Sequence, residues 1–350
     1  MFSPMKTPET IYESSLESRT IYLPSSISPQ GIDCMHRSAS PPANLVSRRF
    51  SMNDEQETFS EFVDDRHKLF LYGVHLLDPF TASLRIPNVV SVLLERFRKN
   101  HGGIPESAKQ ETQDNSDLHK LWEAASWEEV RDNLLFIGPS FGSIDGNYRL
   151  NHKGNGEMYM HLMRDTVDRL FPEAPTPDIL YGYSRGSLDQ PDTPHFPSWI
   201  IDEGEATSSD LFYPFLIVKM QGHGAKSSGC MHRATNECMV ASSICVRMID
   251  KLNQRLAERH GQFEPLNCAV FSIALNGAVA RVYVTFAWDE NIDHMCKVDS
   301  FLLEDPEHHW KLHKLIRSIV AWGNEERRRQ IIDAISTIRL KGPRWYPRYE

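Results

Sequence analysis

The chain has 350 residues, of which 40% are hydrophobic and 24% are charged, a composition typical of a globular protein in water. Its longest apolar runs, such as Phe215–Val218 and Leu134–Ile137, are far too short to cross a bilayer, so no membrane association is expected. The first twenty residues are polar and contain three Glu residues, which argues against a secretory or mitochondrial leader. We therefore expect a cytoplasmic or nuclear protein.

The charge of the chain is unevenly distributed. The formal net charge is −9, which argues against a protein that wraps nucleic acid over its whole surface. The segment Trp310–Glu350, however, contains ten Lys or Arg and four acidic residues. A basic segment of this kind is either a solvated helix face or a surface that contacts phosphate.

The first third of the sequence predicts a tail followed by a helical region. Residues 1–52 are rich in Ser and Pro and show no sustained period, which predicts a disordered tail. Residues 53–118 form a predicted N-terminal helical region, with helices expected over Asp54–Leu77 and Ile86–Arg98 because apolar residues recur at helical spacing.

A polar linker over 101–117 is expected to lead into the main domain, 119–345. This domain begins with a short predicted helix over Trp127–Leu135 and a clearer one over Met158–Leu170, whose apolar residues lie on one face.

Strand patterns follow the helices. Asp178–Tyr183 and Tyr213–Gln221 are predicted strands, separated by a long polar loop over 185–210. The second strand is apolar almost throughout, which is typical of a strand buried on both faces. A Gly-rich turn over Gly222–Gly229 then leads into a long helix over Ala234–Glu258. That helix carries a stripe of eight residues on one face: Ala234, Cys238, Ala241, Cys245, Met248, Ile249, Leu252 and Leu256.

The end of the domain predicts a hairpin and two closing helices. Asn276-Gly277 favours a type I′ turn between strands over Cys268–Leu275 and Val279–Trp288. A further strand and two helices, interrupted at Gly323, are expected after it: Met295–Leu303, Glu307–Trp322 and Asn324–Ile338. This order of elements predicts a mixed α/β (α+β) domain with helices on both sides of a central sheet.

Two of the predicted strands carry residues that suggest a site. Pro177-Asp178 stands at the start of one strand, and the next strand ends in the run IVKMQ. A nuclease that uses Mg²⁺ needs acidic side chains on two adjacent strands to hold the ion. It also uses a Lys two residues after the second acid, which projects from the same face of the strand.

Several motifs, taken in their order and spacing over about residues 120–340, resemble the fungal PD-(D/E)XK nuclease-like proteins of uncharacterised function. These motifs are PDILYGYS, YPFLIVKMQ, the helix start ATNEC, VYVTFAWDE and IVAWGNEERRRQIIDAI. The resemblance implies a restriction-endonuclease-like core sheet flanked by helices.

The resemblance also implies a site, which is degenerate in this chain. The family's acidic residue on the first strand corresponds to Asp178, whereas its Glu, its Lys and its helical Gln correspond to Lys219, Gln221 and Glu237. A cation at position 219 stands where a metal ligand is needed, and Asp178 alone would be a poor Mg²⁺ site because this ion prefers several oxygen ligands. We therefore expect Lys219 to form an ion pair with Glu237 or Asp178.

The resulting prediction is a non-catalytic binding or accessory protein without a cofactor, whose partner is a protein or a small molecule. Proteins of this fungal group also accompany secondary-metabolite pathways, which is compatible with such a role. One alternative is an active Mg²⁺-dependent nuclease that uses displaced residues: Asp202, Glu203, Glu205, Asp210 and His223. Another is a protein that binds nucleic acid without cleaving it, through Lys219 and the basic C-terminal helices.

The cysteines predict no second metal site. All six are expected to be thiols, as is usual in a reducing compartment. Four residues resemble a zinc set by type: Cys230, His232, Cys238 and Cys245. Their spacing does not suit a compact zinc knuckle, and two of the cysteines lie in the apolar stripe of the long helix, so a structural role is expected.

Overall fold

The computed structural model describes residues 65–80, 82, 85–99, 104–114, 120, 126, 128–130, 150–153, 156–162, 174–188, 196–222, 231–259 and 264–340. The chain divides into two units, Met1–Phe50 and Ser51–Glu350. All described residues belong to the second unit, so the tail predicted over 1–52 lies outside them.

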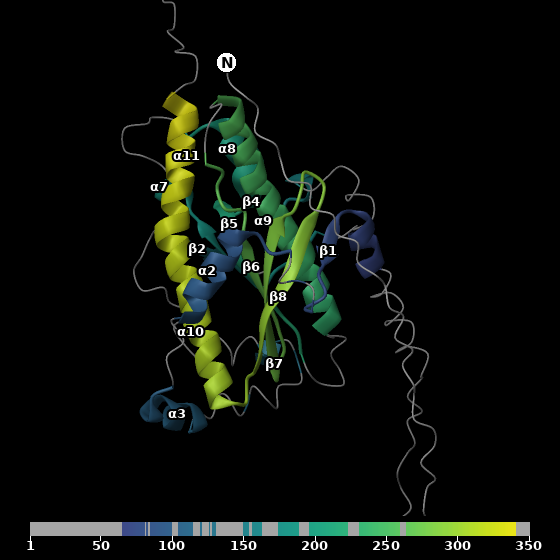
Figure 1. Ribbon diagram of the computed structural model, residues 1–350, viewed down its shortest axis with the longest axis vertical. Helices are drawn as coiled ribbons and strands as arrows, with labels where there is room; N and C mark the ends of the chain where they lie inside the picture. Colours follow the sequence, from purple (N-terminus) through teal and green to yellow (C-terminus); the bar gives the residue numbers. More distant parts are fainter. Residues whose placement is uncertain are drawn as a thin grey trace, which may run out of the picture. The chain divides into compact units, whose positions relative to one another are not determined.

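Within the described part, one mixed sheet runs in the order β1-β8-β7-β6-β5-β3-β2, and β4 pairs with β5 beside this path (Figure 1). β5 is parallel to β6, and β1 is parallel to β8, whereas the other pairs are antiparallel. The strands are β1 (Val74–Leu76), β2 (Leu150–Lys153), β3 (Ile179–Tyr183), β4 (Glu205–Thr207), β5 (Leu211–Met220), β6 (Val270–Leu275), β7 (Val279–Ala287) and β8 (Asp293–Leu302).

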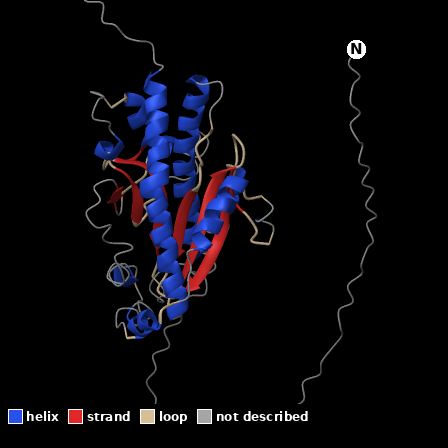
Figure 2. Cartoon of the chain, turned by 60° about the vertical axis from the view of Figure 1, so that its left-hand side comes forward, coloured by secondary structure: helices blue, strands red, loops and turns tan. Residues whose placement is uncertain are grey.

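Helices flank this sheet, which confirms the mixed α/β class (Figure 2). The helices of the described part include a segment over 65–71 and α2 (Asn88–Lys99), α3 (Glu106–Gln113), α7 (Arg185–Leu188), α8 (Ser198–Gly204), α9 (Met231–Arg259), α10 (Pro306–Trp322) and α11 (Arg328–Leu340). On β6, the Phe271 ring meets Phe97 of α2 and Trp322 of α10. The next residue, Ser272, lies beside Cys238 of α9. Successive side chains of a strand point to opposite faces, so α9 covers one face and α2 with α10 the other.

The long helix α9 buries the face that its sequence predicts. All eight residues of the stripe are buried, from Ala234 at 0% exposure to Leu256 at 4%. The helix contacts β5, β6 and β7. Small residues come first in the stripe, which lets the N-terminal half of α9 approach the sheet closely.

The first predicted helix ends earlier than expected. The helix expected over Asp54–Leu77 is present over 65–71, but the chain then turns at Gly73, whose φ is 77°, and Val74–Leu76 forms strand β1 along β8. A positive φ ends a helix, and the exposed edge of β8 offers backbone groups for pairing.

Segments expected to be loops also contain regular structure. α3 lies within the predicted linker, while α7, α8 and β4 lie within the predicted loop over 185–210. Of the helix expected over Met158–Leu170, residues 158–162 are described, and only Met160–Leu162 is helical, as a 3₁₀ turn. These elements are short, so their apolar periodicity is weak.

The hairpin of β6 and β7 is confirmed, but its turn differs from the type I′ prediction. Asn276 is not among the described residues with a positive φ. Instead its side-chain Oδ1 accepts hydrogen bonds from the N–H groups of Ala278 and Val279, at 3.0 and 2.8 Å. An Asn that binds the backbone ahead of it in this way forms an Asx turn, which needs no left-handed residue.

The expected break at Gly323 is a continuous π-helical turn, Gly323–Arg327, that joins α10 to α11. Gly323 has ordinary helical angles, φ −60° and ψ −44°. Its lack of a side chain matters because a Cβ there would lie 2.1 Å from Cζ of Phe215. The Tyr183 hydroxyl also donates a 2.7 Å hydrogen bond to the Gly323 carbonyl, which joins this turn to β3.

Replacement of Gly323 tests this close approach. Alanine is favoured over glycine in a helix by about 1 kcal/mol, but the new methyl would collide with the Phe215 ring. We expect Gly323→Ala to lower the free energy of unfolding by about 1–3 kcal/mol, as overpacked cores do. Chemical denaturation measures this change. The control is Gly186→Ala in α7, where a Cβ meets nothing within 4 Å; equal stability of the two variants would contradict the packing argument.

Candidate functional site

The end of β5 and the start of β3 bring two of the predicted site residues together. The strands are antiparallel, and Ile179 lies opposite Val218. The N–H of Asp178 donates a 3.0 Å hydrogen bond to the Val218 carbonyl, so Asp178 lies beside Lys219. Glu237, on the second turn of α9, completes the group.

The Lys219 ammonium lies between two carboxylates. Its Nζ is 2.8 Å from Oε2 of Glu237 and 3.9 Å from Oδ2 of Asp178, and it donates to the Thr176 carbonyl at 2.9 Å. The Asp178 carboxylate also accepts a hydrogen bond from the backbone N–H of Met220, and Arg233 pairs with the other oxygen of Glu237 at 3.3 Å. The expected ion pair between Lys219 and Glu237 is therefore present.

Burial gives these interactions a role in stability. The side chain of Lys219 is 11% exposed and that of Asp178 is 3% exposed. A buried charge is costly unless it is paired and hydrogen-bonded, and both groups meet this condition. Gln221, the fourth predicted site residue, lies just after β5, is partly exposed, and donates its backbone N–H to the Leu275 carbonyl at 2.9 Å.

The residues present do not fit a Mg²⁺ ion between Asp178 and Glu237. The Lys219 ammonium already lies at hydrogen-bond distance from the Glu237 carboxylate, and a hard cation needs several oxygen ligands rather than a like-charged neighbour. In the part of the chain that is described, no group of three or more His, Cys, Asp or Glu side chains is placed to hold a metal ion.

The acidic residues of the alternative Mg²⁺ site do not lie near Asp178. Asp202, Glu203, Glu205 and Asp210 all precede β5, whereas Lys219 lies near its end. At about 3.3 Å per residue, this length of strand separates the two groups by roughly 25 Å. Glu203 forms a two-bond ion pair with Arg255 of α9. Burial raises the pKa of Glu205, and a hydrogen bond from the Asp210 backbone opposes this rise. His223 lies outside the described residues.

The cysteines of α9 lie in the core. Cys238 and Cys245 are fully buried, and burial raises the pKa of each thiol well above its usual value. A thiol held in the protonated form is a poor metal ligand. Cys230, another member of the zinc-like set, lies outside the described residues.

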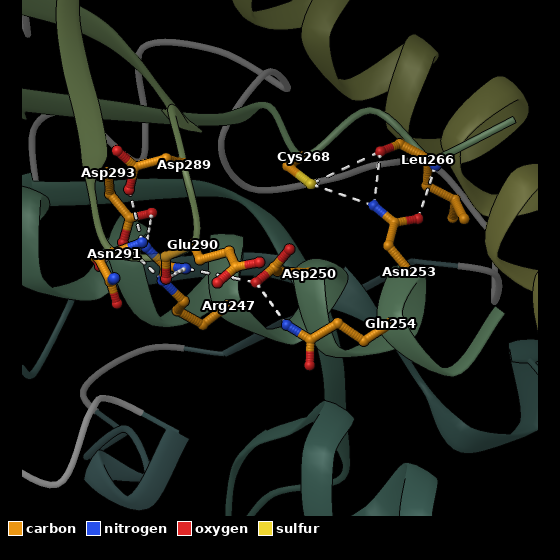
Figure 3. A network of polar contacts seen from close by, with 11 residues as sticks. Arg247, Asp250, Asn253, Gln254, Leu266, Cys268, Asp289, Glu290, Asn291 and Asp293 are labelled. Atoms are coloured by element: carbon orange, nitrogen blue, oxygen red, sulfur yellow. Dashed lines mark hydrogen bonds and ion pairs between the residues drawn. The ribbon is translucent and has the colours of Figure 1, made fainter. Parts of the chain in front are cut away.

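A second buried ion pair, between Arg247 of α9 and Asp293 of β8, was not predicted from the sequence. Arg247 Nη2 is 2.6 Å from Asp293 Oδ1, and its Nε is 3.1 Å from Oδ2 (Figure 3). The Ser243 hydroxyl donates to the same carboxylate, and Arg247 also donates to the Glu290 carbonyl at 3.0 Å. Two parallel N–H···O bonds fix both side chains. One sign of this pair is visible in the sequence, because Arg247 lies among apolar residues of the long predicted helix.

A protein-family model described as a domain of unknown function, DUF7924, matches residues 100–335 of the chain. The chain belongs to the DUF7924 family. The DUF7924 region contains Asp178, Lys219, Gln221 and Glu237. No curated protein matches the chain. Among the helices described here, none combines the length and the apolar character needed to cross a membrane.

A double-mutant cycle tests whether the ion pair between Lys219 and Glu237 stabilises the fold. We expect Lys219→Met to lower the free energy of unfolding by about 3 kcal/mol, because it removes the ammonium that lies 3.9 Å from the buried Asp178 carboxylate. Glu237→Gln should cost less, and the coupling energy between the two changes should be about 1–3 kcal/mol. Denaturant titration of the four variants measures it.

The matched control is the exposed pair of Arg96 and Glu326, whose atoms are 2.7 Å apart. Surface pairs of this kind contribute about 0–1 kcal/mol. A coupling energy for Lys219 and Glu237 as small as that of the control pair would contradict the argument from burial.

Proposed function

We propose that the protein is a nuclease-like binding protein without catalytic activity, in which the Lys219 ammonium takes the position of a metal ion. The observation that carries this proposal is the position of Lys219 Nζ, 2.8 Å from Glu237 and 3.9 Å from Asp178. Such a group binds a partner or a small molecule and performs no hydrolysis.

The arrangement of the four residues supports a nuclease-like origin. Asp178 and position 219 lie side by side on adjacent strands, as the two acids of a metal-dependent nuclease must. Gln221 is two residues after Lys219, and side chains two apart on a strand project from the same face. With an acid at position 219, the carboxylates of Asp178 and Glu237 would have a third carboxylate beside them.

The chemistry of lysine supports the absence of hydrolysis. A metal ion lowers the pKa of a bound water and stabilises the charge that develops on phosphate. An ammonium that is shared between two carboxylates has no open coordination position and cannot activate water in this way. The resemblance to fungal proteins that accompany secondary-metabolite pathways supports an accessory role.

In the described part of the C-terminal helices, three of the basic side chains already have partners within the protein. Arg327 is 1% exposed, and its guanidinium lies over the Trp322 ring at 5.0 Å. Lys311 pairs with Glu307 at 2.7 Å, and the Lys314 ammonium lies over the Trp310 ring. This distribution is the reason why the alternative of nucleic-acid binding through these helices is not favoured.

Restoring an acid at position 219 tests the proposal. We expect the wild-type chain to show no Mn²⁺ binding that depends on Asp178, and to leave plasmid DNA uncleaved in Mn²⁺. The double variant Lys219→Glu/Gln221→Lys should gain Mn²⁺ binding, because it places several carboxylate oxygens around one position. Isothermal titration calorimetry measures the binding.

The control adds Asp178→Asn to the double variant, which should remove the gained binding, while circular dichroism confirms that each variant is folded. Two results would contradict the proposal. One is Mn²⁺ binding or DNA cleavage by the wild-type chain that Asp178→Asn abolishes. The other is a folded double variant that binds no Mn²⁺, since the site would then lack the geometry of a metal-dependent nuclease.

A further inference from the structure

A cleft of about 460 Å³ lies on the face of the sheet opposite to α9. It is lined by residues of α2, of α10 and of the π-helical turn Gly323–Arg327, and α2 packs against α10 (Figure 1). The apolar part of its lining comes from Phe97, Ala321 and Trp322. The rings of Phe97 and Trp322 meet edge to face with their centroids 6.4 Å apart. The cleft is therefore separate from the Lys219 group, which lies under α9.

At one end of the cleft, an ion pair joins α2 to the π-helical turn. Arg96 Nη1 lies 2.7 Å from Oε2 of Glu326, so these two charges balance each other. Glu325, the preceding residue, also lines the cleft and is exposed. Single π-helical turns within α-helices are frequent at functional sites. This end of the cleft therefore carries a surplus of negative charge.

At the other end, two cations of α10 line the cleft. Lys314 and Arg317 are three residues apart, a spacing that makes them neighbours on one helix face. No carboxylate among the described residues forms an ion pair with either of them. The Lys314 ammonium lies 4.9 Å from the centroid of the Trp310 ring, a contact that leaves its positive charge in place. A positive potential that the protein does not neutralise attracts an anion.

We infer that this cleft binds a small carboxylate with an apolar body. The Arg317 guanidinium presents a planar pair of N–H donors that matches two carboxylate oxygens, and the apolar body lies against Phe97 and Ala321. The volume of the cleft is within the range of small-molecule sites, about 300–1,000 Å³.

The charges of the cleft also orient this ligand. Glu325 is eight residues after Arg317, roughly 12 Å along the helix, and it repels a carboxylate at that end. The inference goes beyond the proposed function and does not depend on it, because no residue of the Lys219 group lines the cleft.

Binding of three probes to the full chain tests the inference. The probes are 2-naphthoate, which has both the carboxylate and an apolar body, 2-naphthylmethanol, which lacks the charge, and acetate, which lacks the apolar body. Isothermal titration calorimetry measures their binding at low salt, where exposed charges are least screened. We expect the wild-type chain to bind 2-naphthoate about tenfold or more tightly than either of the other probes, because only 2-naphthoate adds a charged hydrogen bond to apolar contact.

Two variants change the cleft in different ways. Arg317→Gln removes the guanidinium and should weaken 2-naphthoate binding about tenfold or more, the loss typical of a charged hydrogen bond. Ala321→Phe places a ring in the cleft and should weaken the binding at least as much. Both positions are exposed, so both variants should fold, which circular dichroism checks. The matched control is Arg329→Gln, which removes an exposed arginine of α11 that does not line the cleft and should bind as the wild type does.

Any of four results would overturn the inference. The wild type binds no 2-naphthoate, or it binds one of the other two probes as tightly. Either Arg317→Gln or Ala321→Phe, when folded, binds 2-naphthoate with unchanged affinity. Arg329→Gln loses as much affinity as Arg317→Gln. Failure here is distinguishable from failure of the proposed function, because the gain of Mn²⁺ binding by the Lys219→Glu/Gln221→Lys variant concerns the opposite face of the sheet.

Discussion

The ion pair between Lys219 and Glu237, with Asp178 beside it, joins three elements that are far apart in sequence. Asp178 directly precedes β3, Lys219 lies near the end of β5, and Glu237 lies near the N-terminus of α9. Lys219 and Asp178 are nearly buried, so their charges need partners within the protein. The interaction therefore constrains how α9 lies on the sheet, and it also decides which chemistry this place in the fold allows.

A second buried ion pair also joins helix α9 to the sheet. Arg247 and Asp293 form their two-bond pair ten residues further along the helix, a distance of about 15 Å at 1.5 Å per residue. Between the two ion pairs, the helix contacts the sheet through the buried apolar stripe. The apolar residues supply most of the stabilisation, and the two ion pairs specify the position of the helix because an alternative position would leave buried charges unpaired.

Sequence alone predicted the parts of the fold that have strong local signals. The buried strand β5, the long helix α9 and the β6–β7 hairpin follow from apolar periodicity and a turn residue. Strand β1 was missed because three residues carry no period and because its partner β8 lies more than two hundred residues away. The turn at Asn276 was misassigned because its side chain, rather than a left-handed backbone, closes the turn.

The candidate site was also predicted only in part. Asp178, Lys219 and Glu237 could be placed together because a resemblance supplied their positions, and the structure brings their side chains into contact. The pair of Arg247 and Asp293 was not predicted, because only the position of α9 on the sheet brings the two side chains together. The same holds for Tyr213, whose left-handed backbone (φ 45°) within β5 has no signature in the sequence.

The central claim is that a lysine ammonium occupies the position that a metal ion takes in a nuclease. A crystal structure of the wild-type chain grown with Mn²⁺, with anomalous scattering measured at the manganese edge, tests it most directly. The account predicts no anomalous peak between Asp178 and Glu237, and electron density for Lys219 Nζ within hydrogen-bond distance of Glu237. A manganese peak coordinated by Asp178, with the Lys219 side chain turned away, would contradict it.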